Sequence, residues 1–218
     1  MPSTTLLAEL DGILRRQPRL AGLIGKQPGE PELPEVVHAV TLDQSSAYPM
    51  VRMSCVHGKG RLWVGGLPGI HEPGTSEKEL FALAAFGIQR LVCLIPADHL
   101  AGAYERPEYV PAARSLFGEA FHHLEIGDYQ VPSDDDAFEQ TVELVEDAIE
   151  RGEQLLVHCG AGCGRTGTFV CCLMTRQGMD PIQAVREYRR VRTCGPETLH
   201  QVAYVRRYAM RMDGSRAR

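Results

Sequence analysis

The sequence predicts an α/β fold in which helices flank a central, mostly parallel sheet. From about residue 51 onward, short apolar strand segments alternate with helical segments. Two of the strand segments, residues 88–95 and 153–159, are nearly continuous apolar runs. Strands of that kind are covered on both faces, as they are in parallel sheets. Ligands of such folds bind at the carboxyl ends of the strands, so functional residues are sought there.

Length and composition are typical of one globular domain with an extension. The chain has 218 residues, of which 44% are hydrophobic and 23% charged. Residues 1–50 are expected to form an N-terminal accessory extension. A short amphipathic segment at residues 6–14 precedes the Pro- and Gly-containing stretch KQPGEPELPE, which breaks regular structure. The main domain is expected over residues 51–212, followed by a C-terminal tail, residues 213–218.

The first part of the main domain is predicted as a hairpin and a helix. VRMSCV (51–56) and RLWVGG (61–66) are strand-like segments on either side of the turn HGKG. The next helix can be capped by Thr75 or Ser76, and Gly87 follows its last apolar residue.

The middle of the chain continues the alternation. After the apolar strand 88–95, we expect a loop over residues 96–107, a short helix over 109–117 and a strand over 120–126. DDAFEQTVELVEDAIERG (135–152) has its apolar residues on one helical stripe. Ser133 or Asp134 can cap that helix. EQLLVHC (153–159) is the next strand.

Three helices complete the domain. Residues 165–178 are apolar almost all round, which predicts a buried central helix. Asp180 and Pro181 begin the next helix as an N-cap and first-turn pair, and a last helix covers about 197–212. Nine arginines lie in residues 186–218. They are expected to lie on solvated helix faces, with a basic rim for anionic substrates as the alternative.

The segment VHCGAGCGRTGT (157–168) carries the strongest chemical signal. Its glycines let the backbone amides of the turn face an oxyanion, and a helix that starts near Arg165 adds its N-terminus. The planar guanidinium group of Arg165 can hold two phosphate oxygens at once. This positive environment favours a thiolate at Cys159, which is positioned for in-line attack on a bound phosphoryl group. The expected substrate-binding loop is Gly160, Ala161, Gly162, Cys163, Gly164 and Arg165.

HCGAGCGRTG resembles the His-Cys-x-x-Gly-x-x-Arg-Ser/Thr signature of the cysteine-dependent protein tyrosine phosphatase superfamily. The matching residues are His158, Cys159, Gly162, Arg165 and Thr166. LWVGGLPG is similar to the opening strand of the compact, dual-specificity-like branch, and the resemblance covers roughly residues 57–212. It implies a phosphatase catalytic domain that hydrolyses phosphate monoesters through a cysteinyl-phosphate. No metal and no cofactor are expected, because Arg165 and the amides supply the positive charge.

The resemblance also implies supporting roles. Thr166 is expected to donate a hydrogen bond to the sulfur of Cys159, and His158 to fix the loop by hydrogen bonding. The proton donor is an aspartate about 30 residues before the cysteine, on a loop. Asp128 in EIGDYQVPSDDD is the first choice. The other acidic candidates are Asp134, followed by Asp135, Asp136 and, more distantly, Glu125.

Two absences distinguish the sequence from the tyrosine-specific branch of the superfamily. That branch has tryptophan two residues before the acid, where this chain has Ile126, and the single tryptophan is Trp63. No counterpart of the tyrosine-bearing loop stands out, which favours a shallower site. Gln201 partly matches a water-positioning glutamine, with helix-surface packing as the alternative, although Glu197 stands where a second glutamine is expected.

The expected substrates are phosphotyrosine and also phosphoserine or phosphothreonine on proteins, or small phosphate esters. No lysine lies within the loop to meet the extra phosphates of a phosphoinositide, which stays an alternative substrate. A phosphate-binding pseudophosphatase is the non-enzymatic alternative. The five residues between Cys159 and Arg165 favour phosphoryl transfer over rhodanese-type sulfur transfer.

The seven cysteines have irregular spacing, which predicts reduced thiols and a cytoplasmic location. Cys163, Cys171 and Cys172 are candidates to pair with an oxidised Cys159. The N-terminus lacks the pattern of a signal peptide, and no apolar run is long enough for a membrane span. No nucleic-acid partner is expected, and the sequence indicates no oligomeric state.

Overall fold

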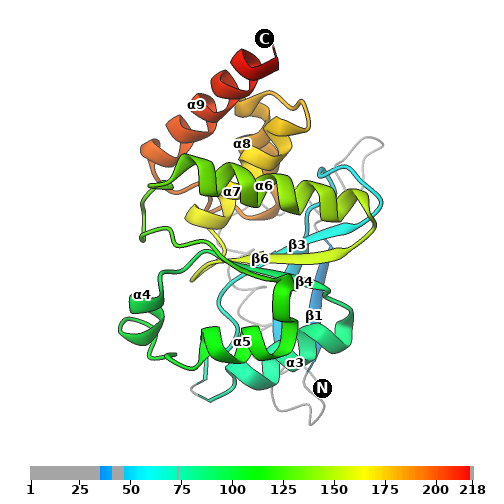
Figure 1. Ribbon diagram of the computed structural model, residues 1–218, viewed down its shortest axis with the longest axis vertical. Coiled ribbons are helices and arrows are strands. Elements are labelled where there is room, and N and C mark those ends of the chain that lie inside the picture. Colours follow the sequence, from blue (N-terminus) through cyan, green and yellow to red (C-terminus); the bar gives the residue numbers. More distant parts are fainter. Residues whose placement is uncertain (1–34, 41–46, 73, 217–218) are drawn as a thin grey trace, which may run out of the picture. The chain divides into compact units, whose positions relative to one another are not determined.

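The computed structural model describes residues 35–40, 47–72 and 74–216. Six strands in these residues form one sheet in the order β1-β2-β3-β6-β4-β5 (Figure 1). The strands are β1 (Val36–Val40), β2 (Ala47–Arg52), β3 (Arg61–Gly65), β4 (Arg90–Cys93), β5 (Phe121–His123) and β6 (Gln154–His158). The pairs β3–β6, β6–β4 and β4–β5 are parallel, whereas the pairs β1–β2 and β2–β3 are antiparallel. The predicted α/β fold with a mostly parallel sheet is confirmed.

The antiparallel edge begins earlier in the chain than the sequence pattern predicted. β2 starts at Ala47 and ends at Arg52, because Tyr48 and Met50 alternate with exposed residues and bury their side chains in the core. The predicted accessory extension therefore contributes both β1 and part of β2 to the sheet. The amphipathic segment at residues 6–14 lies outside the described residues.

The helices agree with the sequence pattern, with one addition. They are α3 (Ser76–Phe86), α4 (Ala97–Ala101), α5 (Tyr109–Phe117), a 3₁₀ turn (Gly118–Ala120), α6 (Asp135–Glu150), α7 (Gly164–Arg176), α8 (Pro181–Val191) and α9 (Leu199–Arg216). The expected loop over 96–107 contains α4, a helix too short to show an apolar period. Asp134 caps α6 through the amides of Asp136 and Ala137, and Asp180 caps α8.

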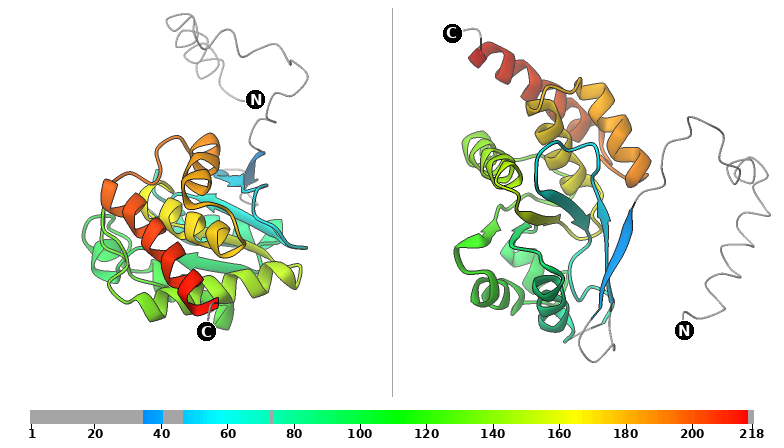
Figure 2. Two further views of the ribbon diagram at one scale, coloured as in Figure 1. Left: turned by 90° about the horizontal axis from the view of Figure 1, so that it is seen from above. Right: turned by 90° about the vertical axis from the view of Figure 1, so that its right-hand side faces the viewer.

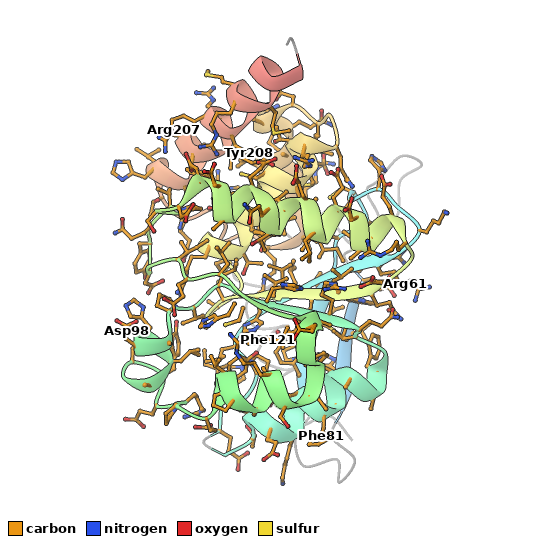
Figure 3. The ribbon with its side chains drawn as sticks, in the orientation of Figure 1. Arg61, Phe81, Asp98, Phe121, Arg207 and Tyr208 are labelled. Atoms are coloured by element: carbon orange, nitrogen blue, oxygen red, sulfur yellow. A yellow bond between two sulfur atoms is a disulfide. The ribbon has the colours of Figure 1, made fainter. Side chains whose placement is uncertain are left out.

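The helices form a layer on each face of the sheet (Figures 1 and 2). α3 and α5 cover one face, and α6, α7, α8 and α9 cover the other. Phe138 of α6 joins this second layer through edge-to-face contacts with the rings of Phe169, Tyr204 and Tyr208. Figure 3 shows Tyr208 where α9 faces α6, and Phe81 on the outer side of α3.

The sheet brings three connections to one edge. β6 is paired on both sides, and His158 at its end lies opposite Gly65 of β3 and Cys93 of β4. The segments that follow these three residues therefore start side by side. Among the described residues, none of the helices combines the length and apolar character that crossing a membrane requires.

Candidate active site

The connection from β6 to α7 is a tight loop, residues 159–163, at this edge of the sheet. Gly162 has a φ of +69°, and a Cβ there would overlap the carbonyl oxygen of Gly65. A Cβ on Gly160 would overlap the hydroxyl of Tyr104. Glycine is therefore required at position 162, whereas a side chain at position 160 would require Tyr104 to shift. The loop leads directly into the N-terminus of α7, an arrangement suited to binding an oxyanion.

Cys159 and Arg165 are the two buried functional groups of this loop. Cys159 directly follows β6 and is 2% exposed, and Arg165, in the first turn of α7, is 3% exposed. Burial lowers the pKa of the Arg165 guanidinium, but the electrostatic interaction with Cys159 and the contacts with Tyr104 and Asp128 outweigh burial and raise it. The guanidinium therefore stays charged next to the sulfur. A buried cation of this kind requires anionic or hydrogen-bonding partners.

Asp128 supplies one of these partners from the loop that follows β5. Its Oδ1 lies 2.9 Å from Arg165 Nη2, and its side chain is 47% exposed. The same oxygen accepts a hydrogen bond from the Tyr129 amide at 3.2 Å. Tyr129 has a φ of +57°, a left-handed conformation that is uncommon for a tyrosine. The structure thus brings Asp128 to the same guanidinium that would hold a phosphate.

The alternative acids have other partners. The carboxylate of Asp134 caps α6, and that of Asp135 accepts a hydrogen bond from the hydroxyl of Tyr204 at 2.6 Å. Asp136 is an exposed residue of the first turn of α6. Glu125 accepts a hydrogen bond from the amide of Ala97 at 2.9 Å. Geometry therefore favours Asp128 over these four.

Tyr104 is a site residue that the sequence patterns missed. Its hydroxyl accepts a hydrogen bond from Arg165 Nη2 at 3.3 Å, beside Asp128. Arg106 holds this segment in place: its buried side chain donates to the carbonyl oxygens of Tyr104 and Glu105 and, across the site, to that of Gly69. The available signal was that Tyr104 lies after a predicted strand, at the edge where ligands bind.

His158 is fully buried beneath the loop. Its Nε2 lies 2.7 Å from the hydroxyl of Tyr109 on α5, which fixes the end of β6 by a hydrogen bond. Burial lowers the pKa of His158 to about 3, so the imidazole is neutral at physiological pH. This neutral state makes His158 a support for the loop and not a source of charge.

Thr166 does not make the hydrogen bond expected from the sequence. Its Oγ is buried and has no hydrogen-bond partner among the described residues, so the predicted bond to the sulfur of Cys159 is absent from this structure. Thr168, two residues further along α7, donates to the carbonyl of Gly164 in the ordinary helical pattern.

Gln201 is buried where three segments meet. Its Oε1 accepts hydrogen bonds from the amides of Glu197 and Thr198, and its Nε2 donates to the carbonyl of Gln130 at 3.2 Å. Gln130 lies two residues after Asp128. The side-chain amide therefore ties the start of α9 to the loop that carries Asp128. Its full burial contradicts helix-surface packing, and water positioning by Gln201 stays a prediction.

The cysteine pattern requires a correction. Cys163, which was expected as a free thiol, forms a disulfide with Cys194, whose Cα lies 5.3 Å from that of Cys163. Cys163 is thus already paired and is not available to an oxidised Cys159. The spacing of the cysteines does not reveal this pair, because the partners are 31 residues apart and only the packing of the α8–α9 connection against the loop brings them together.

The α8–α9 connection supports the loop by more than this bond. The Arg192 guanidinium donates to the carbonyl oxygens of Ala161 and Gly162. A Cβ on Gly195 would overlap the carbonyl of Cys163, so the two backbones are in close contact. Burial in α7 raises the pKa of Cys171 and of Cys172, which keeps both as thiols in the core.

Sequence comparison gives a family match over most of the chain. A family model described as "PTP-SAK: Swiss Army Knife protein, DSP-PTPase phosphatase domain" matches residues 65–212. A probable protein tyrosine phosphatase type IVA B of Dictyostelium discoideum is 36% identical over 99 residues, which is 43% of this chain and 60% of the relative. The type IVA A protein of the same organism is 28% identical over 120 residues, which is 54% of this chain and 70% of the relative.

Solved structures share the fold. Kinase associated phosphatase, in a form whose catalytic-site cysteine is replaced by serine, has a TM-score of 0.67 at 19% identity. The comparison covers 84% of this chain and 98% of that one. Tk-PTP in its active form has a TM-score of 0.57 at 26% identity, and the comparison covers 70% of this chain and 93% of that one.

The buried histidine makes stability depend on pH. The pKa of His158 is lowered to about 3 in the folded chain from 6.5, so the unfolded chain binds more protons between these values. Stability should therefore fall as pH drops below about 6.5. We expect His158 to account for a loss of about 2 kcal/mol between pH 7.5 and 5.0. Urea unfolding of the wild type and of His158→Gln at both pH values measures this, and equal losses in the two proteins would refute it.

The disulfide should stabilise the fold. Closing a 31-residue separation contributes about 3–4 kcal/mol in the chain-entropy description of disulfides. We expect Cys194→Ser to lower the unfolding free energy by about that amount under oxidising conditions, and to leave the protein insensitive to dithiothreitol. Cys55→Ser, which removes a free cysteine, is the control. A wild type whose urea midpoint does not change on reduction would contradict this expectation.

Proposed function

The chain belongs to the DSP-PTPase phosphatase domain family of the Swiss Army Knife proteins, and from this premise we propose that it is a cysteine-dependent protein phosphatase. Its proposed substrates are phosphotyrosine and also phosphoserine and phosphothreonine side chains. One observation carries the proposal: Asp128 and Arg165, 37 positions apart in the chain, meet at 2.9 Å beside the loop that begins with Cys159. Nucleophile, anion-binding cation and proton donor thus share one site.

In the first step, the Cys159 thiolate attacks the phosphorus atom in line with the leaving oxygen. A sulfur–phosphorus bond forms as the phosphorus–oxygen bond of the ester breaks. Arg165 and the loop amides hold the other phosphate oxygens, where charge is stabilised most effectively because the site is buried. Asp128 gives its proton to the leaving oxygen, so that the alcohol or phenol departs neutral.

In the second step, water hydrolyses the cysteinyl-phosphate. The Asp128 carboxylate takes a proton from the water as its oxygen attacks phosphorus, and the sulfur leaves as a thiolate. Thr166 lies in the first turn of α7 with a buried hydroxyl that has no hydrogen-bond partner among the described residues, and we propose that it donates to the departing sulfur. The cycle ends with inorganic phosphate bound by the loop from Cys159 to Arg165, which we refer to as the cradle, and with the proton back on Asp128.

In this structure the Asp128 carboxylate forms an ion pair with the Arg165 guanidinium. A phosphate in the cradle binds the same guanidinium, so substrate takes the place of the Asp128 carboxylate on Arg165 Nη2. Tyr104 stays hydrogen-bonded to Arg165 and keeps the guanidinium in its orientation.

Other sequence-based expectations stay predictions. These are the cytoplasmic location, the absence of a nucleic-acid partner and the division of the chain at residue 50. A phosphorylated substrate follows from the family itself.

The nucleophile assignment is tested with Cys159→Ser. We expect turnover of p-nitrophenyl phosphate to fall by roughly 10⁴-fold or more, because the alcohol is a far weaker nucleophile than the thiolate. Inorganic phosphate, measured by calorimetry, should still bind, since Arg165 and the loop are unchanged. Retention of wild-type turnover would remove Cys159 from the mechanism.

The proton-donor assignment is tested with Asp128→Asn, using Asp134→Asn as the matched control. Asparagine can still cap α6, so the control should keep wild-type activity. We expect Asp128→Asn to lower kcat for phenyl phosphate by roughly 100-fold, and to have a smaller effect on p-nitrophenyl phosphate, whose leaving group needs less protonation. The opposite result for the two variants would assign the acid to Asp134.

A further inference from the structure

A second cavity lies beside the phosphate cradle. It has a volume of about 290 Å³ and lies between β2, the segment after β3 and the first residues of the cradle loop. Its walls include Tyr48, Pro49, Leu67, Ile70, Ala161 and Arg192. We refer to this cavity as the side pocket. Neither Cys159 nor Asp128 lines it, so the hydrolytic chemistry does not account for it.

The side pocket shares a wall with the cradle. Gly160, which follows Cys159, lines the pocket, and its carbonyl accepts a hydrogen bond from the Leu67 amide at 2.8 Å. A Cβ on Gly66 would lie only 2.9 Å from that carbonyl oxygen, so the two backbones are in close contact. When the phosphate of a substrate lies in the cradle, the part of the substrate next to that phosphate therefore lies near the side pocket.

The walls of the side pocket are already formed without a ligand. The Tyr48 hydroxyl donates to the Gly66 carbonyl at 2.7 Å, and the Glu79 carboxylate accepts from the Gly69 amide at 2.6 Å. Tyr48 and Glu79 are 2% and 5% exposed. A pocket held by buried hydrogen bonds loses little conformational freedom when a ligand enters it.

The charges at the side pocket compensate each other. Glu79 and Arg192 both line the side pocket, so a carboxyl group and a guanidinium face the same cavity, and His71 lies on its wall as well. Arg192 already donates to Ala161 and Gly162, and Glu79 already accepts from Gly69. A second phosphate would meet the Glu79 carboxylate, and a lysine side chain would meet Arg192. An uncharged group avoids both repulsions.

The rim of the side pocket is apolar and accessible. Ile70 is 37% exposed, and Ala161 and Pro49 are exposed as well. Exposed apolar groups next to a concave site mark a surface that a ligand covers. Leu67 continues this apolar surface into the interior, where it is 1% exposed.

We propose that the side pocket binds an uncharged, apolar side chain close to the phosphorylated residue of a peptide substrate. This inference rests on the proposed phosphatase function and adds a sequence preference to it. The cradle holds the phosphate, and the side pocket selects which phosphorylated segment is hydrolysed fastest. The occupant is a peptide side chain because the pocket has room for one group, is uncharged overall and adjoins the loop that holds the phosphate.

The test uses synthetic phosphotyrosine peptides with alanine at the other positions. Leucine, aspartate or lysine replaces one alanine at a time, at the two positions before and the two after the phosphotyrosine. We expect leucine at one of these positions to raise kcat/KM about tenfold over alanine, the size expected for burial of an aliphatic side chain. Aspartate and lysine at that position should give no gain.

Ile70→Asp tests whether the side pocket is the source of this preference. The variant places a charge on the rim and should abolish the leucine preference while leaving turnover of p-nitrophenyl phosphate within about twofold of wild type. Ile182→Asp is the matched control, because Ile182 is 44% exposed on α8 and does not line the pocket. It should keep the leucine preference.

The outcomes separate this inference from the function on which it rests. Turnover of all peptides without a leucine preference, or a preference that survives Ile70→Asp, would overturn the side-pocket assignment and leave the phosphatase standing. Failure to hydrolyse any phosphate ester would overturn both. If Ile70→Asp changed hydrolysis of a short-chain phosphoinositide but not the peptide preference, the pocket would belong to a lipid substrate, and the peptide assignment would be wrong.

Discussion

A buried guanidinium is the constraint on which the site depends. Arg165 is 3% exposed at the start of a helix that is buried along most of its length, so its charge must be met by nearby groups. The Asp128 carboxylate, the Tyr104 hydroxyl and the Ile126 carbonyl provide partners from two different loops. Those loops are held near the end of β6 because the strands that precede them are parallel neighbours in the sheet. The cation that would bind phosphate thus also organises the loops around it.

The backbone of the cradle loop is supported from the side away from this cation. Arg192 holds the carbonyls of Ala161 and Gly162, and the disulfide joins Cys163 to Cys194. Because the carbonyl oxygens of Ala161 and Gly162 accept hydrogen bonds from Arg192, the opposite side of the loop is available to the backbone amides. Rigidity of this kind is useful in a site that stabilises charge, because preorganised dipoles need little rearrangement during the reaction. The α8–α9 connection therefore supports a loop whose proposed chemistry takes place on residues of other segments.

The antiparallel edge of the sheet has a separate consequence. β2 comes from residues that the sequence pattern placed partly in an accessory extension, yet Tyr48 and Pro49 line the side pocket. In the proposed mechanism the parallel strands and their loops supply the reacting groups, and the antiparallel edge supplies a neighbouring surface without them. A division of this sort lets the substrate preference vary while the chemistry stays constant, because the two surfaces share only the wall at Gly160 and Ala161.

Local patterns in the sequence were sufficient for the fold class, for most helices and strands and for the glycine-rich turn that leads from β6 into α7. These features depend only on residues that are close together in the chain. They are apolar periodicity, helix caps such as Asp180 and a glycine-rich turn before a helix. The choice of Asp128 needed the family resemblance, and the contact with Arg165 supports it by geometry. Tyr104, Arg106, the Cys163–Cys194 bond, the link from Gln201 to Gln130 and the side pocket were decided by the tertiary structure alone. Each of these joins segments far apart in the chain, and which segments meet depends on strand order and helix packing, which no short stretch of sequence contains.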